Sequence, residues 1–274
     1  MTQPDWIAAE WGAAHLRIWQ IGAEGRVLST AESGEGYEQT DAPGPALRRL
    51  LPDLDASVPV LMSGAGLLPS PAVPCTPPVA AQAREEDGLR LLPGVAQETP
   101  ADLLRGEEVR VAGFLAMNPR FDGVVCLPGA QSRWVHVSAG EIVSFRSFLT
   151  GTLFAGLPRL AAPEAGWDEA ALVEAADRAM GRPAGIAGDL AAVLAEMRLK
   201  GLPAGAASSQ ALGLLIGLEL AAAKPYWLGQ NVALVGEGAL VAPYRAALAA
   251  QHVPVVQADG ARMALEGLKV AWRG

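Results

Sequence analysis

Short apolar runs separated by glycine and proline turns dominate the first half of the chain. Residues 6–30 carry two β-rich runs on either side of Gly22–Gly25, which predicts a hairpin of two strands. Five prolines between Leu67 and Pro78 exclude regular structure there. Further strands are expected over residues 58–62, 89–92, 123–127 and 134–137, and helices over 46–51 and 105–117.

Helical periodicity alternates with short apolar strands in the second half. Helices are expected over 168–180, 186–199, 210–223, 239–251 and 260–270, and strands over 231–235 and 255–257. Ser208 and Ser209 are expected to cap the helix that begins at Gln210. The alternation predicts an α/β protein with right-handed crossovers. The proline-bearing segment 157–183 is expected to hold the transition between two domains, 1–157 and 158–274.

Composition narrows the class of protein. The 274 residues are 51% hydrophobic and 18% charged, as in globular proteins. A net charge of −8 argues against an electrostatic nucleic-acid partner. The N-terminus lacks a signal peptide, and the apolar stretch 211–223 is short for a bilayer and carries Glu219, so we expect a cytoplasmic protein without a membrane partner. Cys75 and Cys126 form no disulfide framework, and Cys126 is expected in the core.

Two glycine turns share one layout. In the first, an apolar strand runs through Glu10 into Gly12 and a second strand. In the second, the strand 123–127 runs into Pro128-Gly129, then polar residues, then a second strand. Glycine lets backbone N–H groups approach an anion, so the two turns could hold one nucleotide between two domains.

These motifs resemble the 2-keto-3-deoxygalactonate kinases (2-dehydro-3-deoxygalactonokinases), in the superfamily of sugar kinases, heat-shock ATPases and actin. The similar segments, in chain order, are Glu10-Trp11-Gly12-Ala13-Ala14-His15-Leu16-Arg17, Leu104-Arg105-Gly106-Glu107-Glu108, Pro128-Gly129-Ala130-Gln131-Ser132-Arg133-Trp134, Gly213–Glu219 and Ala233–Gly236. The resemblance covers nearly the whole chain. It implies two ribonuclease-H-like (actin-like ATPase) α/β domains with a nucleotide cleft between them: an N-terminal domain for phosphate and sugar acid, and a C-terminal domain for the nucleotide. The final helix could pack back on the first domain.

The resemblance also implies a function. The chain would transfer the γ-phosphoryl group of ATP to the 6-hydroxyl of 2-keto-3-deoxygalactonate or a related sugar acid, with Mg²⁺, and could form a homodimer. The implied catalytic residues are Glu10, Arg105, Glu107, Glu108 and Arg133, with Glu10 also at the metal. The implied sugar-acid contacts are Arg17, Trp134, Arg146 and Thr150. The implied nucleotide contacts are Gly12, Gly129, Gln131, Ser132, Gly151, Gly236, Gly238 and Gly260.

Adjacent glutamates at a helix start point about 100° apart, so one of Glu107 and Glu108 is expected to face the site and the other solvent. Arg133 replaces a lysine of the family and keeps a cation that can pair with phosphate. No Walker A sequence occurs, which excludes a P-loop mechanism.

Several positions depart from the family pattern. Ala13 and Ala130 replace hydroxyl residues, Gln131 replaces a histidine and Thr152 replaces a glutamate. The loop after Gly64 lacks the tryptophan-bearing stretch of the family. The alternative hypothesis is therefore a degenerate relative that binds a sugar acid or nucleotide as a sensor or regulatory protein and transfers nothing.

Overall fold

The computed structural model describes residues 3–40, 42–66, 69–164 and 166–274, and the chain folds into two compact units. The first unit runs to Phe121 and adds Val137–Ser144 and Asp259–Gly274; the second contains Asp122–His136 and Phe145–Ala258. This division differs from the predicted 1–157 and 158–274. The boundary differs because the strands of the second sheet begin directly after Phe121. The helix at the end of the chain belongs to the first unit, the arrangement that the sequence had left open.

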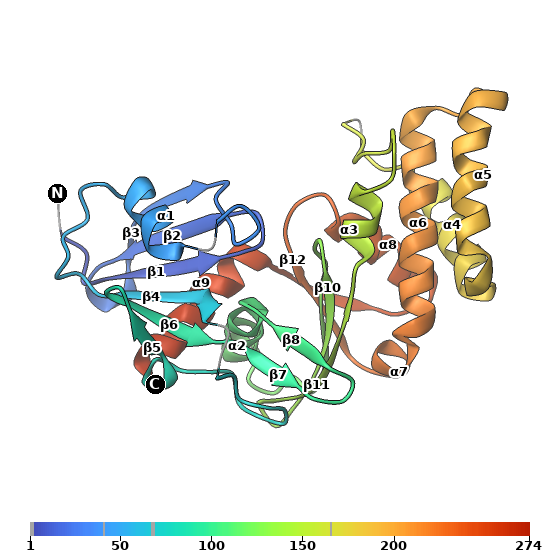
Figure 1. Ribbon diagram of the computed structural model, residues 1–274. Helices are drawn as coiled ribbons and strands as arrows, with labels where there is room; N and C mark the ends of the chain where they lie inside the picture. The colour runs from blue at the N-terminus through green and yellow to red at the C-terminus, as the bar shows by residue number, and fades with distance from the viewer. Residues whose placement is uncertain (1–2, 41, 67–68, 165) are drawn as a thin grey trace. The chain divides into compact units, whose positions relative to one another are not determined.

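The first unit contains a six-stranded sheet in the order β3-β2-β1-β4-β6-β5 (Figure 1). Its strands are β1 (Trp6–Trp11), β2 (Leu16–Ile21), β3 (Val27–Ser33), β4 (Val60–Gly66), β5 (Arg84–Glu86) and β6 (Leu89–Pro93). β1, β2 and β3 are antiparallel neighbours, whereas β4 runs parallel to both β1 and β6. The two strands expected on either side of Gly22–Gly25 are three in the structure, because the turn predicted at Gly12 divides the first run into β1 and β2.

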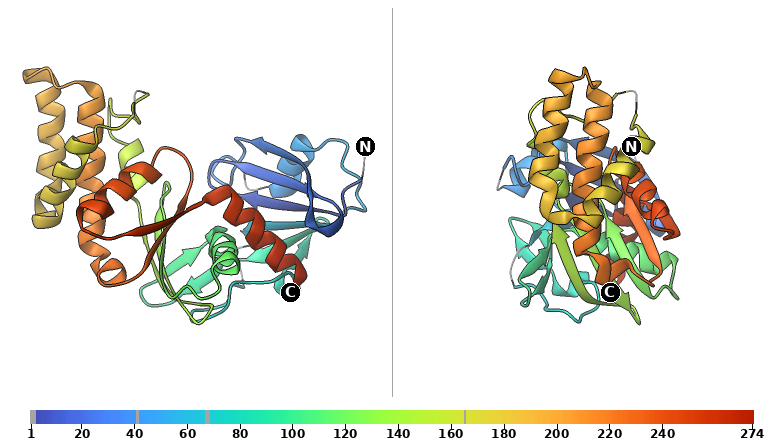
Figure 2. Two further views of the ribbon diagram at one scale, coloured as in Figure 1. Left: turned by 180° about the vertical axis from the view of Figure 1, so that it is seen from behind. Right: turned by 90° about the vertical axis from the view of Figure 1, so that its right-hand side faces the viewer.

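Burial on both faces explains the sequence of β1, in which every residue is buried. Alternate side chains of a strand point to opposite faces. Ile7, Ala9 and Trp11 pack with α1 (Pro43–Leu50), while Trp6 and Ala8 pack with α9 (Gly260–Arg273). Figures 1 and 2 show these two helices on opposite faces of the sheet.

Two glycines bring α9 close to α2 (Glu107–Met117). A Cβ atom at Gly267 would lie 1.7 Å from the carbonyl oxygen of Val109, and one at Gly113 would lie 2.0 Å from that of Met263. Real Cβ atoms do not approach backbone this closely, so the helix contact depends on both glycines. The unit also contains the small antiparallel pair β7 (Val95–Gln97) and β8 (Asp102–Leu104).

The second unit repeats the strand order of the first. Its sheet runs β11-β10-β9-β12-β13, formed by β9 (Gly123–Leu127), β10 (Ser132–Ser138), β11 (Glu141–Phe148), β12 (Val232–Gly236) and β13 (Val255–Asp259). β12 pairs parallel with β9, as β4 does with β1. This repeated order is the one expected of two ribonuclease-H-like domains. Cys126, on β9, is fully buried as predicted.

An apolar helix, α6 (Ala204–Ala222), lies at the centre of the second unit's helical layer. It packs against α4 (Glu169–Gly181) through Gly213 and Gly217, where a Cβ would lie 2.2 Å from a carbonyl oxygen of α4. Figures 1 and 2 show α4, α5 (Ile186–Leu199) and α6 side by side. Within the described residues, α6 alone has the length and composition of a membrane span, but 67% of that stretch is buried in the protein.

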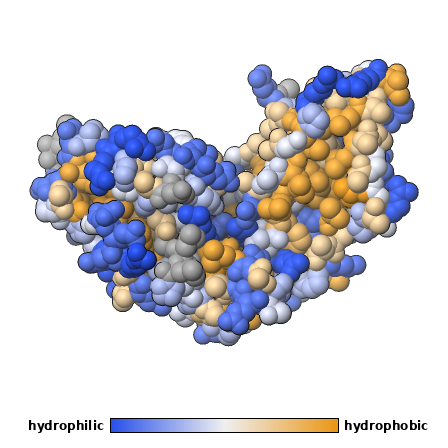
Figure 3. Space-filling model, in the orientation of Figure 1, coloured by the Kyte–Doolittle hydropathy of each residue, from blue (hydrophilic) through white to orange (hydrophobic). Residues whose placement is uncertain are grey.

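Ser208 and Ser209 do not cap α6, which begins four residues earlier than Ser208, at Ala204. Both serines are buried inside the helix. Their hydroxyls accept hydrogen bonds from the backbone N–H groups of Ala161 and Asp168, at 3.3 and 3.0 Å. They therefore hold the segment that leads into α4. Helices α3 (Thr150–Ala155), α7 (Lys224–Trp227) and α8 (Val241–Ala250) complete the unit, and hydrophobic residues also gather on its surface over α3 and α6 (Figure 3).

Candidate functional site

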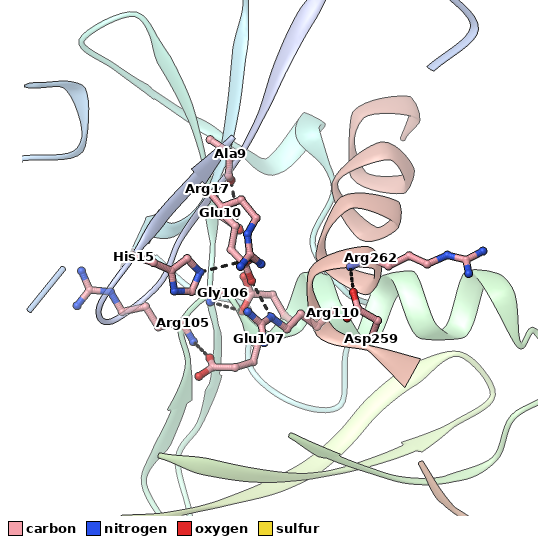
Figure 4. A network of polar contacts seen from close by, with 12 residues as sticks. Ala9, Glu10, His15, Arg17, Arg105, Gly106, Glu107, Arg110, Asp259 and Arg262 are labelled. Carbon is pink, nitrogen blue, oxygen red and sulfur yellow. Dashed lines mark hydrogen bonds and ion pairs between the residues drawn. The ribbon is translucent and has the colours of Figure 1, made fainter. Parts of the chain in front are cut away.

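Glu10 lies at the centre of a cationic cluster in the first unit (Figure 4). It is 3% exposed and pairs across the sheet with Arg17. Its Oε1 accepts a hydrogen bond from Nε of Arg110 at 2.6 Å, and its Oε2 lies 3.4 Å from Nε2 of His15 and 3.6 Å from Nη1 of Arg17. Burial alone would raise the Glu10 pKa, but the charge of Arg110 and the hydrogen bonds from His15 and Arg110 lower it to about 2.

The cluster does not fit the prediction that Glu10 holds magnesium. Both of its carboxylate oxygens already face cationic or proton-donating side chains, and a divalent cation would meet the repulsion of Arg110 and Arg17. No group of three or more metal-ligating side chains occurs among the described residues. Glu10 instead pairs with Arg110 of α2 and with Arg17 of β2.

The two adjacent glutamates at the start of α2 differ in exposure. Glu108 is fully buried, and its Oε2 accepts a hydrogen bond from the backbone N–H of Gly106 at 2.8 Å. Its Oε1 has no hydrogen-bond partner among the described residues. Glu107 is half-buried, and its Oε2 accepts from the backbone N–H of Arg105 at 2.7 Å. Of the pair, Glu107 is the one that a bound molecule can reach.

Burial, together with the negative charges of Glu107 and Glu10, raises the Glu108 pKa to about 8. Because the folded-state pKa exceeds the unfolded value of 4.5, the protonated form adds stability that is complete below pH 4.5 and is lost as the pH rises towards 8.

The variant Glu108→Gln cannot lose a proton, so its stability should not fall over this pH range. One pH unit is worth about 1.4 kcal/mol for such a group. Between about pH 5.5 and pH 7.5 we therefore expect the unfolding free energy of wild type to fall by about 2 kcal/mol relative to that of Glu108→Gln. Urea denaturation at several pH values measures this difference. Curves that stay parallel would contradict the raised pKa. Glu107→Gln removes a neighbouring negative charge and should move the wild-type decline to lower pH.

Arg105 lies close to Glu107 in the chain, but its guanidinium points away from Glu10 and Arg110. Its Nε donates to the carbonyl oxygen of Gly64 at 2.8 Å. The guanidinium carbon lies 3.9 Å from the ring centroid of Tyr37 and 5.9 Å from that of Trp11. Figure 4 shows the guanidinium directed away from the pair formed by Glu10 and Arg110.

In the second unit, Glu219 of α6 joins residues that the sequence assigned to ligands. Its carboxylate accepts hydrogen bonds from the Ser132 hydroxyl, the Trp134 indole N–H and the Tyr244 hydroxyl, each at 2.7 Å, and from the Thr150 hydroxyl. Glu219 is 2% exposed. Burial raises its pKa, although the four donors oppose that rise.

The Glu219 contacts change the interpretation of three predicted site residues. Ser132, Trp134 and Thr150 are all buried, and each directs its polar group to Glu219 rather than outwards. The expectation that these side chains contact a nucleotide or sugar acid does not match this geometry. Glu219 itself was missed as a site residue, although one carboxylate in the apolar stretch 211–223 is a signal of a buried polar network.

The turn at Gly129–Gln131 remains accessible and is held from behind by α3. Thr152 donates to the Ala130 carbonyl oxygen through both its backbone N–H, at 2.8 Å, and its hydroxyl, at 3.0 Å. A Cβ at Gly151 would lie 2.3 Å from the Gly129 carbonyl oxygen, so only glycine fits there. Ala130 and Gln131 are exposed. The turn therefore has a fixed backbone with an open outer side, as an anion-binding turn requires.

The remaining predicted site residues fall into both units. Gly236 ends β12 beside the second turn, where its Cβ would lie 3.3 Å from Cδ of Pro128. Gly238 has a φ of +74°, which glycine adopts without strain. In the first unit, Gly12 begins the turn after β1, and Gly260 begins α9 after the N-cap residue Asp259 (Figure 4). Arg133 is 4% exposed and Arg146 is exposed.

Comparison with known proteins gives consistent results. The family model described as 2-keto-3-deoxy-galactonokinase matches residues 10–271. The chain is 32% identical to "Probable 2-dehydro-3-deoxygalactonokinase DgoK1" of Rhizobium meliloti, covering 100% of this chain and 98% of that protein. It is 28% identical to the 2-dehydro-3-deoxygalactonokinase of Escherichia coli, covering 93% of each.

Solved structures agree with this result. A crystal structure from Sinorhizobium meliloti, of a protein described as a candidate 2-dehydro-3-deoxygalactonokinase, superposes with a TM-score of 0.84 at 29% identity over 97% of each chain. An activator of 2-hydroxyisocaproyl-CoA dehydratase from Clostridium difficile, with ADPNP bound, shares the fold alone, with a TM-score of 0.52 at 11% identity over 97% of this chain and 93% of that chain. The predicted fold of two actin-like ATPase domains is confirmed, and this chain belongs to the 2-keto-3-deoxy-galactonokinase family.

Proposed function

We propose that the protein transfers the γ-phosphoryl group of ATP to the 6-hydroxyl of 2-keto-3-deoxygalactonate. The observation that carries this proposal is the intact cluster of Arg105, Glu107 and Glu108 at the start of α2, in a chain that matches the family model over residues 10–271. Phosphoryl transfer depends mainly on positioning and on electrostatic stabilisation of the phosphates. The cluster would position the sugar acid, and the backbone N–H groups of the glycine turns would stabilise the phosphates.

We assign the steps of the transfer as follows. The 6-hydroxyl oxygen attacks the γ-phosphorus, the bond to the β-phosphate oxygen breaks, and ADP leaves. Glu107 would accept the hydroxyl proton, because it is the accessible member of the glutamate pair. Glu108 is fully buried and, with a pKa raised to about 8, would not act as the base. Backbone N–H groups around Gly12 and Gly129 would bind phosphate oxygens, whereas Arg133, the predicted cation, is 4% exposed and is assigned no phosphate contact.

One substitution that favoured the alternative hypothesis, a non-catalytic relative, has a structural explanation in the second unit. Thr152 stands where the family has a glutamate, and this loss was one reason to suspect degeneracy. In the structure the Thr152 hydroxyl binds the Ala130 carbonyl oxygen and so supports the turn. The substitution therefore has a structural use in this chain.

The direct test is ADP release from Mg-ATP with and without 2-keto-3-deoxygalactonate. We expect release to depend on the sugar acid, at about 1–100 per second. The 6-deoxy analogue is the matched control, because it keeps every group except the attacking hydroxyl. Release that is equal with the analogue, or absent with both compounds, would reject the proposed transfer.

Magnesium is proposed to enter with the phosphates of ATP, which are its usual ligands in such enzymes. We expect EDTA to abolish the sugar-dependent release and excess Mg²⁺ to restore it. Because Glu10 is not expected to be a metal ligand, excess Mg²⁺ should also restore the activity of Glu10→Gln. A higher Mg²⁺ concentration required by that variant alone would show that Glu10 is a metal ligand.

A cytoplasmic location and a homodimer stay predictions. Cell fractionation would test the location, and light scattering of the purified chain would test the homodimer.

A further inference from the structure

Arg105 is held rigidly by the protein, yet no described residue offers its guanidinium a carboxylate. The Gly64 carbonyl takes its Nε–H, and the Tyr37 ring lies against the guanidinium face. Other arginines of the same unit do find acidic partners. These are Arg17, Arg49, Arg84 and Arg110, each of which pairs with a glutamate. Half-buried Arg90 likewise has no carboxylate partner among the described residues, since it donates to the Ala80 carbonyl oxygen and lies over the Trp272 ring. The role of Arg105 is therefore decided by its position in the fold.

The position of Arg105 is that of a ligand contact. β1 and β4 are parallel, and both end beside it, at Trp11 and Gly66. Ligands of open α/β sheets bind outside the carboxyl ends of parallel strands. The backbone is also closely packed at this edge, since Gly64 has a φ of +85° and its Cβ would lie 2.0 Å from the Trp11 carbonyl oxygen. The guanidinium is therefore presented from a rigid base.

We propose that Arg105 binds the carboxylate of the sugar acid and so selects acids over neutral sugars. Its two terminal nitrogens can donate two parallel hydrogen bonds to the two carboxylate oxygens, the strongest pairing available to a carboxylate. The contact with Tyr37 holds the plane of the fork, so little conformational freedom is lost on binding. This inference rests on the proposed function for the identity of the acid. It makes Arg105 a substrate-binding residue and leaves the proton transfer to Glu107.

The test compares the affinity for acid with that for nucleotide. Arg105→Met removes the charge, and Arg105→Lys keeps the charge without the planar fork. We expect the Kd for 2-keto-3-deoxygalactonate, measured by isothermal titration, to rise about tenfold to a hundredfold in Arg105→Met and less in Arg105→Lys, because a charge-assisted pair contributes about 1.5–3 kcal/mol. The Kd for ATP should not change. The amide of the sugar acid should bind wild type about as weakly as the acid binds Arg105→Met.

Arg49→Met is the matched control. It removes one positive charge from the same unit, at an arginine that is 54% exposed and already paired with Glu35, and we expect acid affinity close to wild type. Thermal melting of each variant confirms that it is folded, and Arg105→Lys keeps the test valid if Arg105→Met does not fold.

The outcomes separate the two proposals. Equal acid affinity in wild type and Arg105→Met, or no acid binding to wild type, would overturn the role of Arg105. Weakened ATP binding with unchanged acid binding would also overturn it and would assign the guanidinium to a phosphate. Acid binding that depends on Arg105 but is followed by no ADP release would reject the transfer reaction and leave the carboxylate contact standing.

Discussion

Replacing Glu219 by alanine is expected to lower the unfolding free energy of the second unit by about 3–5 kcal/mol. The change removes the acceptor of four side-chain hydrogen bonds at a position that is 2% exposed. Each buried donor left without a partner costs about 1–3 kcal/mol, and rotation of the hydroxyls recovers only part of that cost. The truncated side chain also leaves a cavity. Urea denaturation followed by tryptophan fluorescence measures the loss, since Trp134 is one of the four donors.

Two further variants serve as controls for Glu219→Ala. Glu219→Gln keeps one acceptor oxygen and is expected to lose clearly less stability than Glu219→Ala. Glu174→Ala removes an exposed glutamate from the neighbouring helix α4 and should change stability by less than about 0.5 kcal/mol. A Glu219→Ala protein as stable as the Glu174→Ala protein would show that the network contributes little.

Stability and function are connected at this position. Ser132 directly follows the turn Gly129–Gln131, and Thr150 begins the helix that holds the turn through Thr152. Glu219 binds both hydroxyls and therefore keeps the turn and α3 together. At a temperature where Glu219→Gln is still folded, we expect its KM for ATP to rise more than its kcat falls.

The second large effect is expected at the contact between α2 and α9. In Gly267→Ala the new methyl carbon would lie 1.7 Å from the Val109 carbonyl oxygen and 3.1 Å from the Gly113 backbone nitrogen. The obstructing atoms are backbone and cannot rotate away, so the two helices must separate. We expect a loss of about 3 kcal/mol in unfolding free energy, at the upper end of the usual range for overpacking. Thermal or urea unfolding of the purified variant measures it.

Gly188→Ala is the matched control for this substitution. Gly188 lies inside helix α5, and a Cβ there meets no atom within 4 Å. Alanine is about 1 kcal/mol more favourable than glycine inside a helix, so Gly188→Ala is expected to stabilise the protein slightly. The same chemical change thus has opposite signs at the two positions. If Gly267→Ala is also neutral or stabilising, the close approach of α2 and α9 is wrong.

The motifs allowed the family and the fold to be predicted, because both depend on local patterns along the chain. The strand that runs into Gly12 and the one that runs into Pro128-Gly129 are visible as apolar runs ending in glycine turns, and the structure repeats one strand order around them. The short strands β7 and β8 and the eight-residue strand β11 were missed, since each is stabilised by its neighbours in space rather than by its own pattern. The cap assigned to Ser208 and Ser209 failed because their hydroxyls bind backbone that is distant in sequence.

The sequence alone determined which residues can ionise, which positions can adopt glycine-only geometry and which family motifs are present. Tertiary structure decided what those residues do. Whether Glu107 or Glu108 faces outwards depends on how α2 packs, and whether Ser132 meets a ligand or Glu219 depends on where α6 lies. Glu10 shows the same dependence, because its pKa and its partners are set by Arg110, one hundred positions along the chain. Burial and charge pairing depend on residues that are distant in sequence, so a local sequence pattern does not predict them.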